Sequence, residues 1–518
     1  MRNAAGEKVA EGDPATYYVT STVDGFEAST EKTAHLPVPS LAPGMVIEAV
    51  VTKRINVEEG TFPLEIHYLA SSRPIGYSAV FVTGDHDRLK FRSSGIGEPV
   101  TRDGSLVWEA ADPVVYRWEP MQPWYDRILP WVTIGTTSEN WREAGDDYLA
   151  MIGDKLDSER VADMAARLVD GVDDTQRKIE IISHYVQKEL RYEAIEFGRR
   201  AYVPKTARET LTDRYGDCKD HAVLLVSMLQ AVGVPAQLAL VNLNQRIVPE
   251  LPNIDQFDHM IVSVAVDGRR LFIDSTDKDL RLGTTPPRYM AGSHALVLGE
   301  PAELLPIPEF TVGDSGLQVE RAIETIADDE LRVTEVGVFS GYQAADMRGQ
   351  LREIEVSEML GTMQRWVADR YTDAIVDDAF VDNVFDASGE LVVELQYRLP
   401  IDAGSFRLPS FFEATFLDYE RLPERRFGFE IPAPLTVSTV TTVRQSPSAV
   451  LKLASKKPDA DESRFGSWRR KIDSDDERWV LRLEYTSGRD EFGPDEYRAF
   501  TDFHRKLVGA IEQPVVIE

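Results

Sequence analysis

The sequence predicts an α+β protein in which a helix-rich central domain lies between two strand-rich ends. At 518 residues the chain is too long for a single ordinary hydrophobic core. Residues 1–135 and 301–518 consist mostly of β-branched or alternating apolar runs between Gly and Pro turns, whereas residues 136–300 open with apolar side chains at helical spacing. We therefore expect an N-terminal β-rich domain (1–135), a central α+β domain (136–300) and a C-terminal β-rich domain (301–518) with one or two helices. The two flanking domains should be sandwich-like.

The charge of the chain limits the partners it can bind. Lys and Arg total 57 against 87 Asp and Glu, a formal net charge of −30. Nucleic-acid binding needs a basic stripe that this sequence lacks, so we expect no nucleic-acid partner. No apolar stretch reaches the length of about eighteen residues that a membrane-spanning helix needs. The first residues lack the apolar core of a secretory signal, and the single cysteine excludes an intramolecular disulfide.

Strands are expected at both ends of the chain. In the N-terminal part, Met45–Thr52 and Ser78–Thr83 are rich in β-branched residues. Between them and residue 135 lies a cluster of aromatic side chains, which we expect to form a core or a domain seam: Trp108, Trp118, Trp124, Tyr125 and Trp131. In the C-terminal part, strand patterns such as 331–339 and 390–397 are interrupted by one amphipathic helix at about 343–371, and a second helix runs from Pro494 to about Ile511.

The central part changes from helices to strands along its length. Residues 138–149 and 154–168 are predicted helices, and a third begins after the capping residues Asp173 and Asp174. Its apolar residues recur at helical spacing: Ile179, Ile182, Val186 and Leu190. Strands at 237–241, 260–266 and 270–275 then predict a small antiparallel sheet.

The only cysteine lies in the stretch RYGDCKDH, at the start of the most apolar helix. Asp217 is a good N-cap, and Gly216 allows a sharp turn before it. The helix runs from Cys218 to about Val232, and its residues are apolar almost all round, so it should be the buried central helix. The polar residues next to the cysteine indicate that this end of the helix meets a cleft or the surface.

Cys218, as the first residue of that helix, has two readings. The positive end of the helix stabilises a thiolate, and a free backbone N–H there can donate to an oxyanion, so the position suits a nucleophile. Free cysteines are also commonly inert core residues. A nucleophilic thiol requires a histidine base and a group that orients it.

Two histidines are candidates for the base. His221 lies one helical turn after Cys218, but its orienting group would have to come from the same helix. One Cys and one His at this spacing, without a second pair, fall short of a zinc site, so we expect no metal and no cofactor. His259 opens a strand that faces a second strand across Asp267-Gly268, a strong signal for a two-residue hairpin turn.

The hairpin register decides whether His259 has a partner. A two-residue turn pairs Val266 with Arg269, and it places His259 and Asp274 on one face as diagonal neighbours roughly 7–8 Å apart at the backbone. A three-residue loop would turn Asp274 to the opposite face. Taken singly, each residue also suits a plain structural role at a strand end.

Four motifs together resemble the bacterial transglutaminase-like superfamily: Tyr215-Gly-Asp-Cys-Lys-Asp220, the helix end Gly233-Val-Pro235, Phe257-Asp-His259 and Ile273-Asp-Ser-Thr276. The resemblance implies a papain-like core in which Cys, His and Asp follow one another in this chain order. It extends more weakly to the strand-rich ends of the chain.

The resemblance implies a role for each site residue. Cys218 would be the nucleophile, His259 the base and Asp274 the carboxylate that orients it. Members of the family usually carry an export signal, which implies a periplasmic or extracytoplasmic location. The start of this chain lacks such a signal, which leaves two alternatives open: a cytoplasmic protein, or a chain that begins after a leader.

The expected activity is acyl transfer from a peptide bond or a glutamine amide through a thioester. Water as acceptor makes a protease or amidase and a primary amine makes a transglutaminase; the resemblance favours the protease. The expected partner is a protein or peptide substrate. The alternative is a non-catalytic module of the same fold that binds peptides or glycans.

Overall fold

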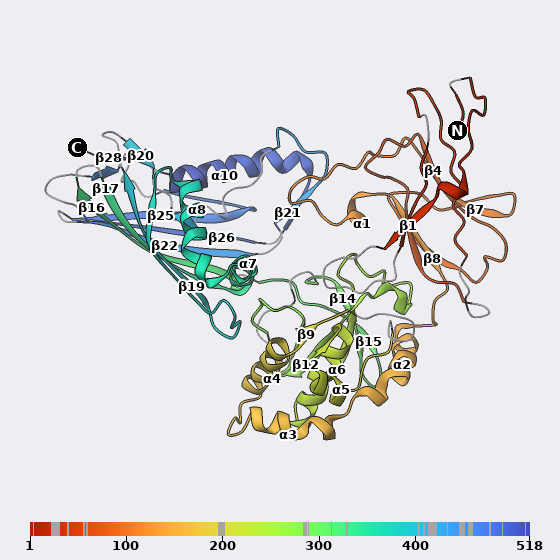
Figure 1. Ribbon diagram of the computed structural model, residues 1–518, viewed down its shortest axis with the longest axis horizontal. Coiled ribbons are helices and arrows are strands. Elements are labelled where there is room, and N and C mark those ends of the chain that lie inside the picture. The colour runs from red at the N-terminus through yellow and green to blue at the C-terminus, as the bar shows by residue number, and fades with distance from the viewer. Residues whose placement is uncertain are drawn as a thin grey trace.

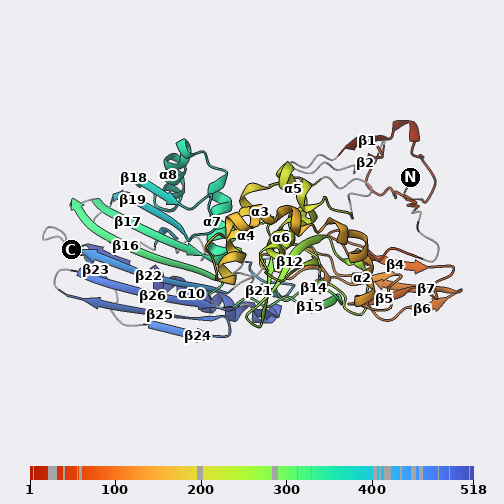
Figure 2. The same ribbon diagram turned by 90° about the horizontal axis from the view of Figure 1, so that it is seen from below.

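The computed structural model describes residues 1–3, 5–21, 32–38, 41–54, 57, 61–194, 202–282, 287, 290–311, 313–327, 330–400, 405–407, 410–412, 422–431, 434–444, 451–453, 459–475, 478–488, 490–512 and 514–517. Figure 1 shows an N-terminal β region in red and orange, a central region with most of the helices in yellow and green, and a large C-terminal sheet in green to blue. Seen from below, the central region lies between the other two (Figure 2). The predicted α+β class is confirmed.

The N-terminal region contains two small antiparallel sheets. The first has the order β3 (Glu65–Tyr68), β8 (Trp131–Gly135), β5 (Lys90–Ser94), and the second β4 (Tyr77–Val82), β7 (Ser105–Ala111), β6 (Val100–Arg102). A separate hairpin joins β1 (Tyr18–Ser21) and β2 (Lys32–His35). Buried Trp108 of the second sheet contacts Phe91 of the first edge-to-face, with ring centroids 5.0 Å apart. The two sheets therefore share one core, as in a sandwich.

The run Met45–Thr52, predicted to be a strand, is not one. Its β contact is a single bridge between Val46 and Arg2. Val50 and Val51 are 86% and 88% exposed. Strand propensity reflects packing on a pleated surface, and no described strand offers this run such a surface. The other predicted strand, Ser78–Thr83, coincides with β4.

The central region begins with helices that pack around α6. The helices are α2 (Trp141–Ile152), α3 (Ser158–Leu168), α4 (Thr175–Glu189), α5 (Ala207–Asp213) and α6 (Cys218–Ala231). Asp174 caps α4, accepting a hydrogen bond from the Arg177 amide at 2.7 Å. The apolar residues that predicted α4 are buried, and α6 packs against α3, α4 and α5. The prediction of a buried central helix that begins at Cys218 is confirmed.

One face of this bundle is covered by a five-stranded antiparallel sheet. Its order is β13 (Arg269–Ile273), β12 (His259–Val266), β11 (Ala236–Val241), β14 (His294–Leu298), β15 (Glu303–Pro306). The predicted antiparallel sheet is thus present. Because β15 belongs to it, we propose that the central domain extends beyond residue 300 to Pro306.

The C-terminal region is built on one eight-stranded sheet. Its order is β18 (Ile375–Asp382), β19 (Leu391–Pro400), β17 (Glu330–Ser340), β16 (Ser315–Ala327), β22 (Leu435–Arg444), β26 (Arg478–Ser487), β25 (Gly466–Ser474), β24 (Asp459–Ser463). Two smaller sheets have the orders β20 (Ser405–Arg407), β28 (Pro514–Ile517), β23 (Leu451–Leu453) and β21 (Phe429–Ile431), β27 (Asp490–Phe492). Only β16 and β22 pair in parallel within the described part of the large sheet.

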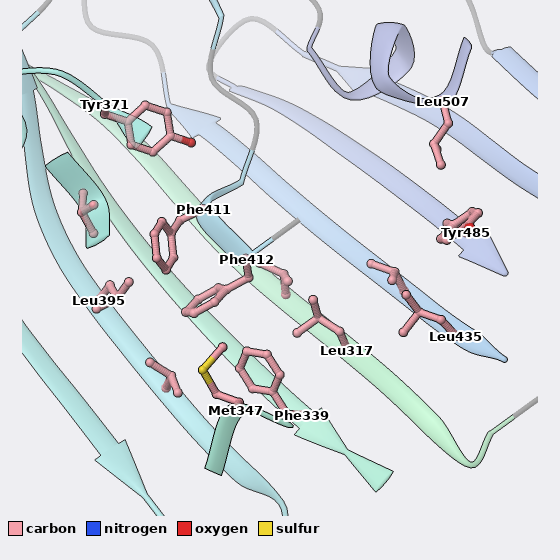
Figure 3. Packing of buried hydrophobic residues seen from close by; sticks show 14 of the residues in the cluster. Leu317, Phe339, Met347, Tyr371, Leu395, Phe411, Phe412, Leu435, Tyr485 and Leu507 are labelled. Carbon is pink, nitrogen blue, oxygen red and sulfur yellow. The ribbon is translucent and has the colours of Figure 1, made fainter. Parts of the chain in front are cut away.

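The core of this sheet lies on the face that its alternating apolar residues share. Figure 3 shows Phe339 and Leu395 on neighbouring strands, with Phe411, Phe412 and Met347 packed over the sheet. Helices α7 (Gly341–Arg352), α8 (Met359–Arg370) and α10 (Tyr497–Ile511) contribute to this core. At this end helices cover the large sheet, which differs from the sandwich-like arrangement that we expected.

Two helices replace the single one predicted at 343–371. A short irregular connection separates α7 from α8. Ile354 and Val356 in this connection are β-branched and lose rotamer freedom in a helix. Val356 is 80% exposed, so packing does not offset that cost. The helix predicted to end at Ile511 is confirmed as α10.

A polar seam joins the N-terminal and C-terminal regions. Buried Glu119 accepts hydrogen bonds from the amides of Arg426 (3.0 Å) and Phe427 (3.3 Å). Arg425 donates to the Pro120 carbonyl at 2.6 Å. The ring of Tyr116 stacks on Phe427 with centroids 6.1 Å apart. The aromatic-rich segment after Trp108 therefore forms a domain seam, one of the two roles expected for it.

Candidate active site

The N-terminus of α6 is fixed by a network of carboxylates. Asp217 caps the helix and accepts hydrogen bonds from the amides of Lys219 (3.0 Å) and Asp220 (3.1 Å). The Lys219 ammonium lies 3.0 Å from the second Asp217 oxygen. Asp220 in turn accepts from the amide of Lys205 at 2.6 Å. These polar side chains are buried, in contrast to the cleft or surface position expected for them.

Gly216 is required here by a close approach rather than by a turn. A Cβ atom at this position would lie 2.4 Å from Cβ of Asp220. The β10 strand (Tyr215–Gly216) pairs with β9 (Arg191–Tyr192) and brings the chain into α6 from the direction of α4. The glycine therefore lets the capping carboxylates pack directly against the backbone.

Cys218 is the first residue of α6 and is 4% exposed. Its amide has no hydrogen-bond acceptor among the described residues. First-turn amides have no partner inside the helix. The N–H is therefore free to donate to an oxygen atom placed beside the thiol.

The hairpin has the predicted register. Asp267 and Gly268 have φ values of 49° and 74°, the left-handed pair that a two-residue hairpin turn requires. Val266 pairs with Arg269 and Val262 with Ile273. Continuing this register one residue past β13 brings Asp274 to the face that carries His259, as the two-residue turn predicted.

His259 and Asp274 form a direct pair. Nε2 of His259 lies 2.8 Å from Oδ2 of Asp274, and the side chains are nearly buried. Burial lowers the pKa of His259, but the Asp274 carboxylate and a hydrogen bond with the Cys218 side chain outweigh it, so the pKa lies well above its usual value. With Nε2 held by Asp274, Nδ1 is the ring nitrogen left for the thiol.

Asp274 is held by the residues that follow it. Its Oδ1 accepts hydrogen bonds from the amide (3.0 Å) and hydroxyl (2.7 Å) of Thr276. Burial raises the pKa of Asp274, but His259 and the Thr276 donors outweigh it and hold the pKa below its usual value. The carboxylate is thus ionised and has both oxygens occupied.

His221 does not share this arrangement. It is fully buried, and its Nδ1 donates to the Asp217 carbonyl at 2.9 Å. Burial, with a contribution from Lys278, lowers its pKa to about 4. Its ring also lies near Tyr192, with centroids 6.0 Å apart. The structure therefore brings Cys218 together with His259 and leaves the neighbouring histidine neutral behind the helix.

Two residues near the thiol were missed by the sequence argument. Tyr148 of α2 is buried, its hydroxyl donates to the Tyr202 carbonyl at 2.8 Å, and burial raises its pKa to about 12. The pKa of this phenol is also affected by the charges of Lys219, Cys218 and Asp217. Nothing in the sequence around Tyr148 marks it, because its place is set by how α2 packs. Lys219 lies next to the cysteine in the sequence, but its role as the buried partner of Asp217 has no local sign there.

The described residues contain no group of three His, Cys, Asp or Glu side chains that could hold a metal ion. No described helix is both long and apolar enough to cross a membrane.

Comparison with known proteins relates this region to a family. The family model of the transglutaminase-like superfamily matches residues 162–273. The match contains Cys218 and His259 and ends one residue before Asp274. No curated protein matches the chain.

Three solved structures are similar to the chain. That of "a putative protease" from Parabacteroides distasonis aligns with 89% of this chain and 76% of its own at 15% identity, with a TM-score of 0.57. "A putative cysteine protease" from Cytophaga hutchinsonii covers 42% of this chain and 78% of its own at 14% identity and a TM-score of 0.21. LapG of Legionella pneumophila covers 27% and 73% at 20% identity and a TM-score of 0.18.

The first of these alignments shows a common fold over most of the chain. The family match adds a sequence relationship for the segment that carries the cysteine and the histidine. Residues 162–273 are therefore a transglutaminase-like domain in the central region, and β-rich sheets lie at both ends of the chain.

Proposed function

We propose that the chain is a cysteine-dependent hydrolase of peptide or glutamine amide bonds, with Cys218 as nucleophile, His259 as acid and base, and Asp274 as the orienting carboxylate. The observation that carries this proposal is the buried 2.8 Å bond between His259 and Asp274. The Cys218 thiol at the start of α6 is close enough to help raise the pKa of the same imidazole. This combination supplies a nucleophile, a proton carrier and a fixed orientation of the imidazole.

The proposed reaction has two half-steps. The Cys218 thiolate attacks the amide carbonyl carbon, and the developing oxyanion accepts a hydrogen bond from the Cys218 amide. The C–N bond breaks as the His259 imidazolium protonates the leaving amine, which leaves a thioester. Neutral His259 then takes a proton from water, hydroxide adds to the thioester, and the carboxylic acid leaves as the thiolate reforms.

Water is the proposed acceptor. The fold is shared with a structure that carries the name "putative protease", which supports hydrolysis over cross-linking. A primary amine in place of water would give a transglutaminase from the same thioester.

The burial of Cys218 favours a second candidate function, that of a binding module without catalytic turnover. At 4% exposure the thiol lies under other side chains, as it would in a module of the same fold that binds peptides without turnover. Under the hydrolase proposal, the thiol reacts in the folded protein. Under the binding-module proposal, it reacts only after unfolding.

A labelling experiment separates the two candidates. We expect iodoacetamide to alkylate Cys218 in the native chain at neutral pH. In peptide libraries incubated with the chain, we expect either cleavage products whose summed mass exceeds that of the substrate by one water, or a gain of about 1 Da where a glutamine amide takes up water and loses ammonia. Cys218→Ala serves as the blank. Alkylation confined to the denatured chain would instead establish the binding module, and an amine-dependent mass gain would establish a transglutaminase.

A groove of about 740 Å³ next to Tyr148 is the proposed approach for the substrate. Its apolar part is formed by Phe62, Pro63, Met151 and Ile254, and its polar part includes Glu139, Glu143, Asp147 and Asp255. No Lys or Arg is among the described residues that line it. Because four carboxylates and several apolar side chains line the groove, it suits a peptide with a lysine or arginine near the amide that reacts.

Reversing one charge tests this preference. Asp147 is exposed on α2 and lines the groove. We expect Asp147→Lys to raise KM for lysine-containing peptides about tenfold, because one opposite charge is lost and a like charge is added. Asp163→Lys, an exposed aspartate on α3 outside the groove, is the matched control. Equal KM values in both variants would exclude the groove as the binding site.

A further inference from the structure

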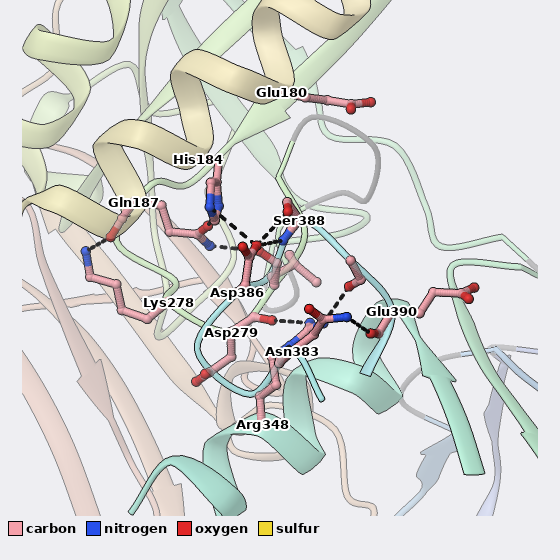
Figure 4. A network of polar contacts seen from close by, with 12 residues as sticks. Glu180, His184, Gln187, Lys278, Asp279, Arg348, Asn383, Asp386, Ser388 and Glu390 are labelled. Carbon is pink, nitrogen blue, oxygen red and sulfur yellow. Dashed lines mark hydrogen bonds and ion pairs between the residues drawn. The ribbon is translucent and has the colours of Figure 1, made fainter. Parts of the chain in front are cut away.

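The segment that follows Asp274 is held from two sides, and one side belongs to the C-terminal region. Figure 4 shows this junction between α4, the segment Asp277–Leu280, α7 and the loop that connects β18 to β19. Asp277 organises the segment itself, since its Oδ1 accepts from the amides of Asp279 (3.0 Å) and Leu280 (3.1 Å).

The central region makes the first set of hydrogen bonds to the segment Asp277–Leu280. The Gln187 side-chain amide donates to the carbonyls of Asp277 (2.5 Å) and Leu280 (2.8 Å). In return, the Lys278 ammonium donates to the carbonyls of Gln187 and Leu190 at the end of α4, the latter at 2.7 Å. The backbone of the segment is therefore tied to the helix that packs against α6.

Two arginines of α7 supply the second set. Arg352 binds Oδ1 of Asp279 through two of its nitrogens and donates to the Lys278 carbonyl at 2.8 Å. Arg348 donates to the Asp279 carbonyl at 2.9 Å. Leu280 packs against Tyr342 of α7 in a small apolar cluster. The C-terminal region thus binds the segment through backbone carbonyls of the segment and through the Asp279 carboxylate.

Arg348 also connects the segment to the rest of the C-terminal sheet. It is 1% exposed, and its remaining donors bind the carbonyls of Asn383 (2.9 Å) and Gly389 (2.6 Å). In the same loop, Asp386 lies 3.4 Å from Nε2 of His184 on α4. A buried guanidinium that satisfies three separate carbonyls fixes three stretches of chain relative to one another.

We propose that Arg348 and Arg352 are positioning residues that hold Asp277–Leu280, and through it Asp274, in the register that His259 needs. The C-terminal sheet region then sets the reactivity of a site whose proposed catalytic residues all belong to the core. This inference rests on the proposed function of Cys218, His259 and Asp274.

The test uses the full chain and two readouts. The first is the rate of iodoacetamide alkylation of native Cys218 between pH 5 and 9. The second is the titration of His259, followed by NMR with ¹⁵N-labelled histidine, which does not require a reactive thiol. The variants are Arg352→Ala, Arg352→Lys and Asp279→Asn, which removes the carboxylate charge and keeps its size. Arg398→Ala is the matched control, because Arg398 makes a paired contact with Asp377 in the same sheet, away from the segment.

In Arg352→Ala and Asp279→Asn, we expect alkylation near pH 6.5 to slow about tenfold, because a small misplacement of an orienting group has effects of this size. The pKa of His259 should fall in both, and Arg352→Lys should recover part of each change. A folded Arg352→Ala or Asp279→Asn chain with wild-type values in both readouts would overturn the inference. If the wild-type thiol is inert but the His259 titration still moves in these variants, the positioning role stands and the proposed function fails. Should Arg352→Ala not fold, the isosteric Asp279→Asn variant decides.

Discussion

Replacing His259 with alanine is expected to lower amide hydrolysis by on the order of 10²- to 10⁴-fold, the usual contribution of a general acid–base residue. Cys218→Ala removes the nucleophile and should lower it at least as far. Because the two residues act as one unit, the double variant should be no slower than Cys218→Ala alone. His294→Ala, a histidine at the start of β14 outside the site, is the matched control. If the rate loss of the double variant equalled the product of the losses in the two single variants, the proposed pairing of Cys218 with His259 would be contradicted.

The pH dependence of turnover provides a second test of the role proposed for His259. His259 must be protonated to release the amine, and Asp274 raises its pKa well above the ordinary value. Turnover should therefore persist above the ordinary histidine pKa and fall as pH rises through the raised value. Asp274→Asn removes the carboxylate, so this alkaline limb should move to lower pH. An unmoved limb in Asp274→Asn would show that another group controls it.

Glu335→Ala is expected to have the largest effect on stability. Glu335 of β17 lies opposite Arg321 of β16, their side chains are at most 1% exposed, and Nε of Arg321 lies 2.7 Å from Oε1 of Glu335. Tyr397 donates to Oε1 at 2.5 Å, and the Phe411 amide and the Ser410 hydroxyl both donate to Oε2 at 3.0 Å. Removing the carboxylate breaks this buried ion pair from one side, which costs about 3–5 kcal/mol.

The measurement is urea unfolding with hydrogen exchange of β16 and β17, which isolates this sheet in a chain of several regions. Glu330→Ala on the same strand is the control, because its pair with Arg398 is about a third exposed and should contribute less than about 1 kcal/mol. The double replacement Arg321→Met, Glu335→Leu should recover only the part of the loss that comes from the ion pair, because the donors of Tyr397, Ser410 and Phe411 still lack their acceptor. A loss in Glu335→Ala as small as in the control would show that water reaches the pair.

The pairing of His259 with Asp274 was predictable because two local signals determine it. The Asp267-Gly268 turn sets the register, and the register sets the shared face. The start of α6 was predictable for a similar reason, since a capping residue and an apolar run lie side by side in the sequence. These features depend on residues close together in the chain.

Other features depend on packing between distant segments and leave no local sign in the sequence. Tyr148 lies near the start of α6 only because α2 packs where it does, and Arg352 meets Asp279 across two regions of the chain. Met45–Thr52 failed in the opposite way: it has the composition of a strand but no partner strand among the residues that the structure describes. The residues proposed for the site could be named from the sequence, but not those that support them.

The seam at Glu119 has a consequence for how the molecule can move. The N-terminal region contacts the core, where the Leu64 amide donates to Asp255 at 3.3 Å. The core contacts the C-terminal region through Arg348, and the C-terminal region returns to the N-terminal one at Glu119. Three bodies joined in such a closed circuit cannot swing about one junction alone. Any motion that separates two of the regions must therefore release a second junction as well, so the two junctions are coupled in their opening.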